Sequence, residues 1–274
     1  MTTQDRGLAA LGFDGVPALR PLTYPGRPVA APSLLTGDEL LGLRVGSGGP
    51  GAWAVEGRGP RRSLDAVLTA LGQAPVAGRR PVVAVGSNAC PGQVAHKLAG
   101  LGLSCAVPMV PVRLRGIGVG CSAHIGRAGY VAAAPYPDPT RRLSLVVSWL
   151  DAAQLAAVDA TELPNYRRTW LPGAAYGMTL PCGTPLDGAY VYVSARGVLT
   201  DPATGLPRPG GGDQAALLDA LLAASPALHA LLGPDAAAWV RRAAEDAALR
   251  ERGTQLFAAA GWVLPSTELR PPLG

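Results

Sequence analysis

An apolar run that breaks into Gly-Ser-Asn constrains the fold of this chain more than any other stretch. Residues 82–91 read VVAVGSNACP, a pattern that predicts a buried strand, a tight turn and a helix that begins near Pro91. At such a junction the backbone N–H groups of the turn point at an anion lying above it. The glycine of the turn permits close approach to the backbone. The stretch therefore predicts half of a binding site.

A second stretch supplies a candidate acid. Residues 150–168 read LDAAQLAAVDATELPNYRR, which is typical of a helix followed by a strand. Steps of three and four residues return to one helix face, so Glu162 shares a stripe with Leu155 and Val158. Burial disfavours the charged form of a carboxylate, which lets a glutamate take up and return a proton near neutral pH. Glu162 is therefore the candidate general base and acid.

Taken in order, these motifs resemble the gamma-glutamylcyclotransferase-like family. Its members carry a Tyr-Gly-Ser-Asn turn after the first strand, a later helix ending in Glu, and a Tyr-x-Arg strand. The matching positions here are Val85-Gly86-Ser87-Asn88, Glu162 and Tyr166-Arg167-Arg168, with residues 129–135 and 143–150 resembling the family's two central strands. The resemblance covers residues 80–196. It departs from the family pattern at Val85, where the family has tyrosine, and at Leu163, where it often has glycine.

The resemblance implies an enzyme that cleaves a gamma-glutamyl amide by internal attack. The substrate's own α-amine closes on the γ-carbonyl, giving 5-oxoproline and a free amine without a covalent enzyme intermediate. In this chemistry Glu162 moves the proton, a role worth about a hundredfold to ten-thousandfold in rate. The substrate-binding candidates are Val85, Gly86, Ser87, Asn88, Ala89 and Tyr166, with the turn N–H groups holding the substrate in a reactive shape. The expected partner is a small molecule carrying a gamma-glutamyl or similar group, with no metal and no cofactor.

Other interpretations of the same residues stay open. Glu162 can simply reach solvent from a helix end, and Ser87 and Asn88 can serve only as helix caps. A thiol-dependent amidase or acyltransferase would use Cys90, because a helix start stabilises a thiolate, but no histidine is evident nearby. The departures from the family pattern favour a third alternative, a non-catalytic protein that binds a small molecule on the same scaffold.

The histidines are weaker candidates for catalytic groups than Glu162. The apolar positions of residues 92–101 fall on one helix face, which turns His96 and Lys97 away from the core. His124 lies in a polar turn before a predicted strand, where loop residues often meet substrate. A hydrogen-bonded or exposed histidine is the favoured interpretation there.

The rest of the chain divides around the core. We expect a Pro/Gly-rich N-terminal arm at residues 1–79, the family-like core at residues 80–196, and a linker with a helical extension at residues 197–274. Outside the core, amphipathic helices are predicted at residues 61–71, capped by Ser63, and at residues 213–224, 234–251 and 253–261. The expected fold class is α+β, with a small mixed sheet that closes into a barrel-like core and helices that flank it. For the C-terminal helices we rank stabilisation of the core ahead of covering the pocket or forming a homodimer contact.

Composition narrows the function classes. The net charge of +5 comes from scattered basic residues with only two phenylalanines, which argues against a nucleic-acid partner. No run approaches the ~18 apolar residues of a membrane span, and the opening residues lack the pattern of a signal peptide. A cytoplasmic protein is therefore expected. The four cysteines show no zinc-site spacing and are expected to be reduced.

Overall fold

A computed structural model describes residues 5–57, 60–265 and 269 of the chain. Its strands are β1 (Ser33–Thr36), β2 (Glu39–Arg44), β3 (Ala54–Val55), β4 (Arg62–Ser63), β5 (Arg80–Ala84), β6 (Val107–Ile125), β7 (Val131–Leu150), β8 (Tyr166–Pro172), β9 (Gly188–Ser194), β10 (Val198–Leu199) and β11 (Val263–Leu264). Its α-helices are α1 (Leu64–Ala70), α2 (Pro91–Ala99), α3 (Ala152–Glu162), α4 (Gly173–Tyr176), α5 (Gln214–Ala224), α6 (Pro226–Leu232), α7 (Ala236–Glu245) and α8 (Ala247–Ala259). Short 3-10 helices are η1 (Pro21–Thr23), η2 (Pro50–Ala52), η3 (Val76–Gly78) and η4 (Ser87–Ala89).

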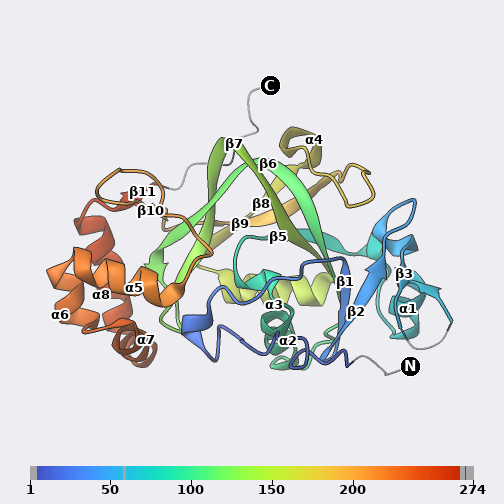
Figure 1. Ribbon diagram of the computed structural model, residues 1–274, viewed down its shortest axis with the longest axis horizontal. Helices are drawn as coiled ribbons and strands as arrows, with labels where there is room; N and C mark the ends of the chain where they lie inside the picture. Colours follow the sequence, from blue (N-terminus) through green and yellow to red (C-terminus); the bar gives the residue numbers. More distant parts are fainter. Residues whose placement is uncertain (1–4, 58–59, 266–268, 270–274) are drawn as a thin grey trace.

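The strands form one large mixed sheet with helices around it (Figure 1). The path of paired strands runs β4-β3-β2-β1-β6-β7-β5-β9-β8, with β10 and β11 attached beside β6. The pair β5 and β9 is parallel and its neighbours are antiparallel. This confirms the α+β class. The barrel-like closure expected from the sequence is not observed, because within the described residues the path ends at β4 and at β8 without joining.

The two longest strands dominate the sheet. The antiparallel pair β6 and β7 has 19 and 20 residues, and the separate strands expected at residues 129–135 and 143–150 are the two ends of β7. The prolines in the middle of β7 suggest two separate strands when only the sequence is considered. In the structure, β6 and β7 pair on both sides of a bulge between Arg115 and Ile117. Gly116 has a φ of 85° at that bulge, a conformation that glycine adopts without strain.

The N-terminal region adds strands to the same sheet. Strand β1 pairs with β6, so the segment before the family-like core is continuous with it through hydrogen bonds. The predicted helix at residues 61–71 is α1, and the Ser63 side chain accepts the Ala66 N–H as its cap. Upstream, Leu8 and Phe13 are buried against the core. The arm is therefore packed onto the molecule along much of its length.

The four helices α5 to α8 of the C-terminal extension form a bundle at one end of the molecule (Figure 1). The helix expected at residues 213–224 is confirmed as α5. Those expected at residues 234–251 and 253–261 are α7 and α8, but the break between them lies at Asp246 and not near residue 252. Asp246 divides them because its side chain accepts the N–H groups that open α8. Helix α6 was not foreseen. The bundle contacts the turn end of the β6–β7 hairpin, where Trp239 Nε1 donates to the Gly129 carbonyl.

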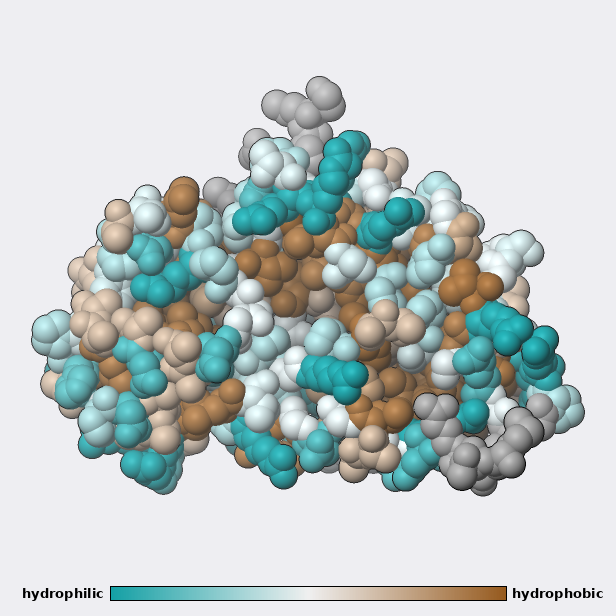
Figure 2. Space-filling view, in the orientation of Figure 1, coloured by the Kyte–Doolittle hydropathy of each residue, from teal (hydrophilic) through white to brown (hydrophobic). Residues whose placement is uncertain are grey.

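Apolar residues gather near the middle of the face drawn in Figure 2, around the place where β6 and β7 cross, and hydrophilic residues cover the crest above them. One apolar cluster packs beneath this crossing and under α1, and a second lies between the sheet and helices α2 and α3. Within the part of the chain that the structure describes, no helix is long and apolar enough to cross a bilayer.

Candidate functional site

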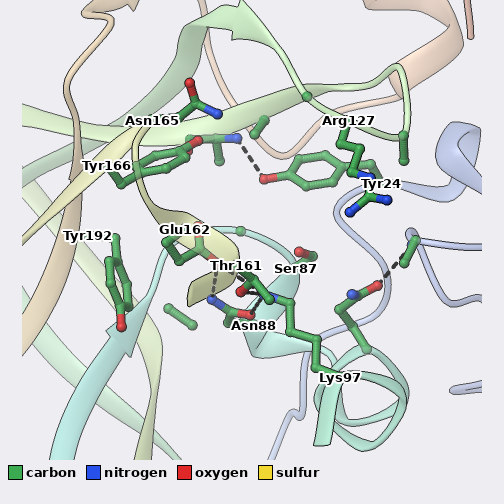
Figure 3. A pocket seen from close by; sticks show the side chains of 18 of the residues that line it. Tyr24, Ser87, Asn88, Lys97, Arg127, Thr161, Glu162, Asn165, Tyr166 and Tyr192 are labelled. Carbon is green, nitrogen blue, oxygen red and sulfur yellow. Dashed lines mark hydrogen bonds and ion pairs between the residues drawn. The ribbon is translucent and has the colours of Figure 1, made fainter. Parts of the chain in front are cut away.

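A cavity of about 790 Å³ opens where β5 ends. Its walls come from the turn after β5, from α2 and α3, from the N-terminal arm and from the turn end of the β6–β7 hairpin (Figure 3). Among the site residues predicted from the sequence, it is lined by Val85, Gly86, Ser87, Asn88, Glu162 and Tyr166. The structure thus brings both predicted halves of the site to one cavity, and the chemical roles of these residues stay predictions.

The turn after β5 is the 3-10 helix η4, followed directly by α2. The Ala89 N–H donates to the Gly86 carbonyl at 3.0 Å, and the Cys90 N–H donates to the Ser87 carbonyl at 3.0 Å. Ala89 is therefore not brought into the site, because its N–H is used inside the turn and its side chain packs against the second apolar cluster. Within the described residues, the N–H groups of Ser87 and Asn88 have no backbone acceptor and are the ones open to a ligand.

Glu162 is the last residue of α3, and its carboxylate faces this turn. Oε1 accepts a hydrogen bond from Asn88 Nδ2 at 3.0 Å and forms an ion pair with Lys97 Nζ at 3.0 Å. Both interactions use the same oxygen, so Oε2 is the one left to meet a ligand. The side chain is 16% exposed. Glu162 therefore lines the cavity and contacts the turn through Asn88.

The position of Lys97 differs from the one expected from the sequence. The helical pattern turns it away from the core, yet its Nζ also donates to Asn88 Oδ1 at 2.8 Å and to Thr161 Oγ1 at 3.0 Å. Its side chain is only 13% exposed, and it is the single lysine of the chain. The long stem lets the ammonium reach from α2 across to α3. The surroundings of Glu162 are therefore charged and hydrogen-bonded on one side, not uniformly apolar. His96, by contrast, is exposed as expected.

The sequence of α3 explains why Glu162 is held firmly. At the start of the helix, Asp151 and Gln154 form a capping box, each side chain accepting the other's backbone N–H, an arrangement that satisfies two otherwise unpaired donors. Near the end, Asp159 accepts from the Tyr192 hydroxyl at 2.7 Å and pairs with Arg168. The helix is thus tied to β8 and β9 one turn before the candidate acid.

A wall of tyrosines completes the cavity. The Tyr24 hydroxyl accepts the Ala133 N–H at 2.6 Å, and the Tyr166 hydroxyl donates to the Ala133 carbonyl at 3.0 Å. Tyr24 stacks on Tyr130 with ring centroids 4.4 Å apart. Burial raises the pKa of Tyr130 to about 12, and it also raises the pKa values of Tyr24 and Tyr166. All three phenols are neutral at pH 7 and act as hydrogen-bonding groups.

Tyr24 was missed by the sequence analysis, because it lies in an irregular stretch of the N-terminal arm. Its hydroxyl lies close to Gly86, where an added Cβ would be 2.2 Å from the phenolic oxygen. Only glycine fits there. The chain has Val85 where the resembled family has tyrosine, and Tyr24 supplies a phenol to the same turn from elsewhere in the sequence.

His124 is a buried and neutral part of the cavity wall. Ser122 Oγ lies 2.7 Å from His124 Nδ1 and 2.8 Å from Ser194 Oγ, which accepts the Arg196 backbone N–H at 3.1 Å. Burial, followed by the charge of Arg196, lowers the pKa of His124 to about 4, and desolvation disfavours imidazolium in this way. The interpretation of a hydrogen-bonded histidine is confirmed.

His124 makes stability depend on pH. The pKa of His124 is about 4 in the folded chain, against an ordinary value of about 6.5. Its contribution to the free energy of unfolding is therefore complete above pH 6.5 and is lost as the pH falls towards 4. We expect the wild type to lose about 3 kcal/mol more than His124→Gln between pH 7 and pH 4, as measured by urea unfolding at both pH values. His96→Gln, at an exposed site, is the control. Equal losses for the wild type and His124→Gln would contradict this account.

The thiol alternative loses support. Cys90 is 1% exposed, it does not line the cavity, and its Sγ would lie 3.0 Å from a Cβ added at Gly26. All four cysteines are unpaired. Within the described residues, no group of three or more His, Cys, Asp or Glu side chains is placed to hold a metal ion.

No protein-family model matches the chain, and no curated protein matches it. Among solved structures, it is similar to one named gamma-glutamyl cyclotransferase, at 14% identity over 42% of this chain and 66% of that chain, with a TM-score of 0.34. An uncharacterized protein from Homo sapiens is 14% identical over 43% of this chain and 67% of that chain, with a TM-score of 0.33. A protein from Arabidopsis thaliana is 16% identical over 43% of this chain and 69% of that chain, with a TM-score of 0.31.

The first of these structures bears the name of the family that the sequence motifs resemble, and this chain spans slightly less than two thirds of its length. With TM-scores of 0.31 to 0.34, these likenesses carry no argument about activity.

Proposed function

We propose that the cavity cleaves a gamma-glutamyl amide by attack of the substrate's own α-amine, releasing 5-oxoproline and a free amine. One observation carries this proposal. Glu162 is held through one carboxylate oxygen by Asn88 and Lys97, while its other oxygen is left for a ligand beside the N–H groups of Ser87 and Asn88. The reaction needs a group that carries a proton and a site that holds the substrate in a folded shape. In this proposal Glu162 is the proton carrier, and the N–H groups of Ser87 and Asn88 hold the substrate.

In the proposed reaction, the substrate's α-ammonium donates a proton to Glu162 Oε2. The freed amine attacks the γ-carbonyl carbon, a C–N bond forms, and the carbonyl becomes a tetrahedral oxyanion. Glu162 then returns the proton to the nitrogen of the leaving amine, the oxyanion re-forms the carbonyl, and the original amide C–N bond breaks. The attacking nitrogen, which is positively charged after the new bond forms, gives a second proton to Glu162, which passes it to the released amine, so the products are a neutral lactam N–H and an ammonium. The carboxylate ends the cycle ionised, as it began. Such proton transfer by a positioned carboxylate contributes about a hundredfold to ten-thousandfold.

Lys97 has a role in this scheme as a positioning residue. Its ammonium lies 3.0 Å from Oε1 and holds that oxygen, which leaves Oε2 as the oxygen that faces the substrate. Its further bonds to Asn88 and Thr161 fix the direction in which the carboxylate points. The N–H groups of Ser87 and Asn88, at the start of a turn and helix, suit the negative charge of the substrate's α-carboxylate. Binding there would bend the substrate towards its reactive shape.

A non-catalytic binding protein is the second candidate, and the Lys97–Glu162 pair favours it. A carboxylate that already has a cationic partner leaves less reason for an incoming ammonium to bind. In that case the cavity would hold a small carboxylate through the turn N–H groups without turning it over.

The experiment that separates the two is incubation of the protein with gamma-glutamyl amides of ammonia, alkylamines and amino acids. We expect equal amounts of 5-oxoproline and free amine to appear, measured by mass spectrometry. If added 5-oxoproline raises the Tm of the protein and no amide gives product, the result would instead support the binding protein.

A further inference from the structure

We propose that the amine released from the substrate carries an extended apolar body, which lies against Leu101 and Leu163 at the mouth of the cavity. This inference rests on the proposed function and names its substrate class. The cavity volume of about 790 Å³ is within the range of roughly 300–1,000 Å³ found for drug-sized ligands. A gamma-glutamyl group, a single residue in size, leaves much of this space for the amine half of the substrate.

Two exposed leucines line the cavity. Leu101 follows the C-terminal end of α2 and is 58% exposed, and Leu163 follows the C-terminal end of α3 and is 55% exposed. Single exposed leucines are ordinary on protein surfaces. Here two of them line one cavity, whereas the other large apolar side chains that are exposed among the described residues, namely Leu19, Leu22, Leu71, Trp170, Leu206 and Leu264, lie outside it.

The charged pair of the cavity lies in the buried part of its lining. The ion-paired Glu162 and Lys97 are largely buried, so the polar end of a substrate belongs inside. Of the other basic side chains in the lining, His124 is buried and neutral, and His96 and Arg127 are exposed. Arg127 comes from the hairpin end and lies beside Tyr24, across the cavity from Glu162 and Lys97 (Figure 3). The side of the mouth formed by α2 and α3 therefore presents two leucines, together with His96 of α2, to the outer half of a ligand.

The test is a series of gamma-glutamyl amides of methylamine, butylamine and octylamine, assayed for 5-oxoproline. We expect kcat/KM to rise about two- to fourfold for each methylene that the leucines cover. The double variant Leu101→Ser/Leu163→Ser should flatten this rise, since its octylamine and methylamine substrates then differ little. Leu206→Ser, at a 65% exposed site away from the cavity, is the matched control and should keep the wild-type slope.

The outcomes separate the inference from the proposed function. Product formation with equal kcat/KM across the series would overturn the inference and keep the function. A preference for the amide of 8-aminooctanoate over that of octylamine would also overturn the inference and keep the function, because it would make Arg127 an anion-binding group. If no 5-oxoproline forms, calorimetric Kd values that fall with chain length would keep the apolar mouth and overturn the cyclotransferase. Neither product nor binding would overturn both.

Discussion

Replacing Glu162 by glutamine is expected to lower kcat by roughly a hundredfold to ten-thousandfold, with a much smaller change in KM. Glutamine keeps the shape of the side chain and can still accept from Asn88 and Lys97 through its amide oxygen, so the cavity is retained. It cannot take the proton from the substrate's α-ammonium or return it to the leaving amine. The measurement is the rate of 5-oxoproline release at saturating substrate.

Two controls make this result specific. Glu245 is also the last residue of its helix, α7, but it is exposed, so Glu245→Gln should leave kcat unchanged. Cys90→Ala should also leave turnover largely intact, because the thiol is buried away from the cavity. If Cys90→Ala abolished turnover while Glu162→Gln preserved it, the thiol-dependent mechanism would replace the one proposed.

Trp239→Ala is expected to cost about 3–5 kcal/mol of unfolding free energy, the usual range for truncation of a buried tryptophan. Trp239 is fully buried in the helical bundle, where its ring lies near Phe257 and its Nε1 donates to the Gly129 carbonyl at 3.0 Å. Gly129 precedes Tyr130 in the turn that also carries Arg127. Because this turn forms part of the cavity wall, kcat/KM should fall as well, and the fall should exceed what a smaller folded fraction explains.

Urea unfolding followed by circular dichroism measures the first effect, and turnover at a temperature where the variant is folded measures the second. Arg241→Ala is the matched control on the same helix, since Arg241 is exposed and its replacement should change stability by no more than about 0.5 kcal/mol. A destabilised Trp239→Ala variant with wild-type kcat/KM would show that the C-terminal bundle stabilises the fold without shaping the cavity.

The parts of the site that follow from local sequence patterns could be predicted. The strand, turn and helix around Gly86 rest on an apolar run, a glycine and a proline at the first helical position, and all three features act within a few residues. The position of Glu162 follows from helical periodicity, because Leu155 and Val158 are buried and fix the direction in which that stripe faces.

The parts that depend on long-range packing could not be predicted. Lys97 lies on a face that periodicity turns outward, and only the approach of α3 gives its ammonium a carboxylate to pair with. Tyr24 reaches Gly86 because the N-terminal arm folds back over the turn, and no local pattern encodes that return. The continuity of β7 through its prolines depends on the partner strand β6, whose bulge at Gly116 absorbs the irregularity.

The most direct test of the central claim is a crystal structure of the wild-type protein with 5-oxoproline. The account predicts the ring inside the cavity, with its nitrogen within about 3.2 Å of Glu162 Oε2 and its carboxylate on the N–H groups of Ser87 and Asn88. A ring bound elsewhere, or bound with its nitrogen facing away from Glu162, would contradict the claim that this carboxylate moves the proton.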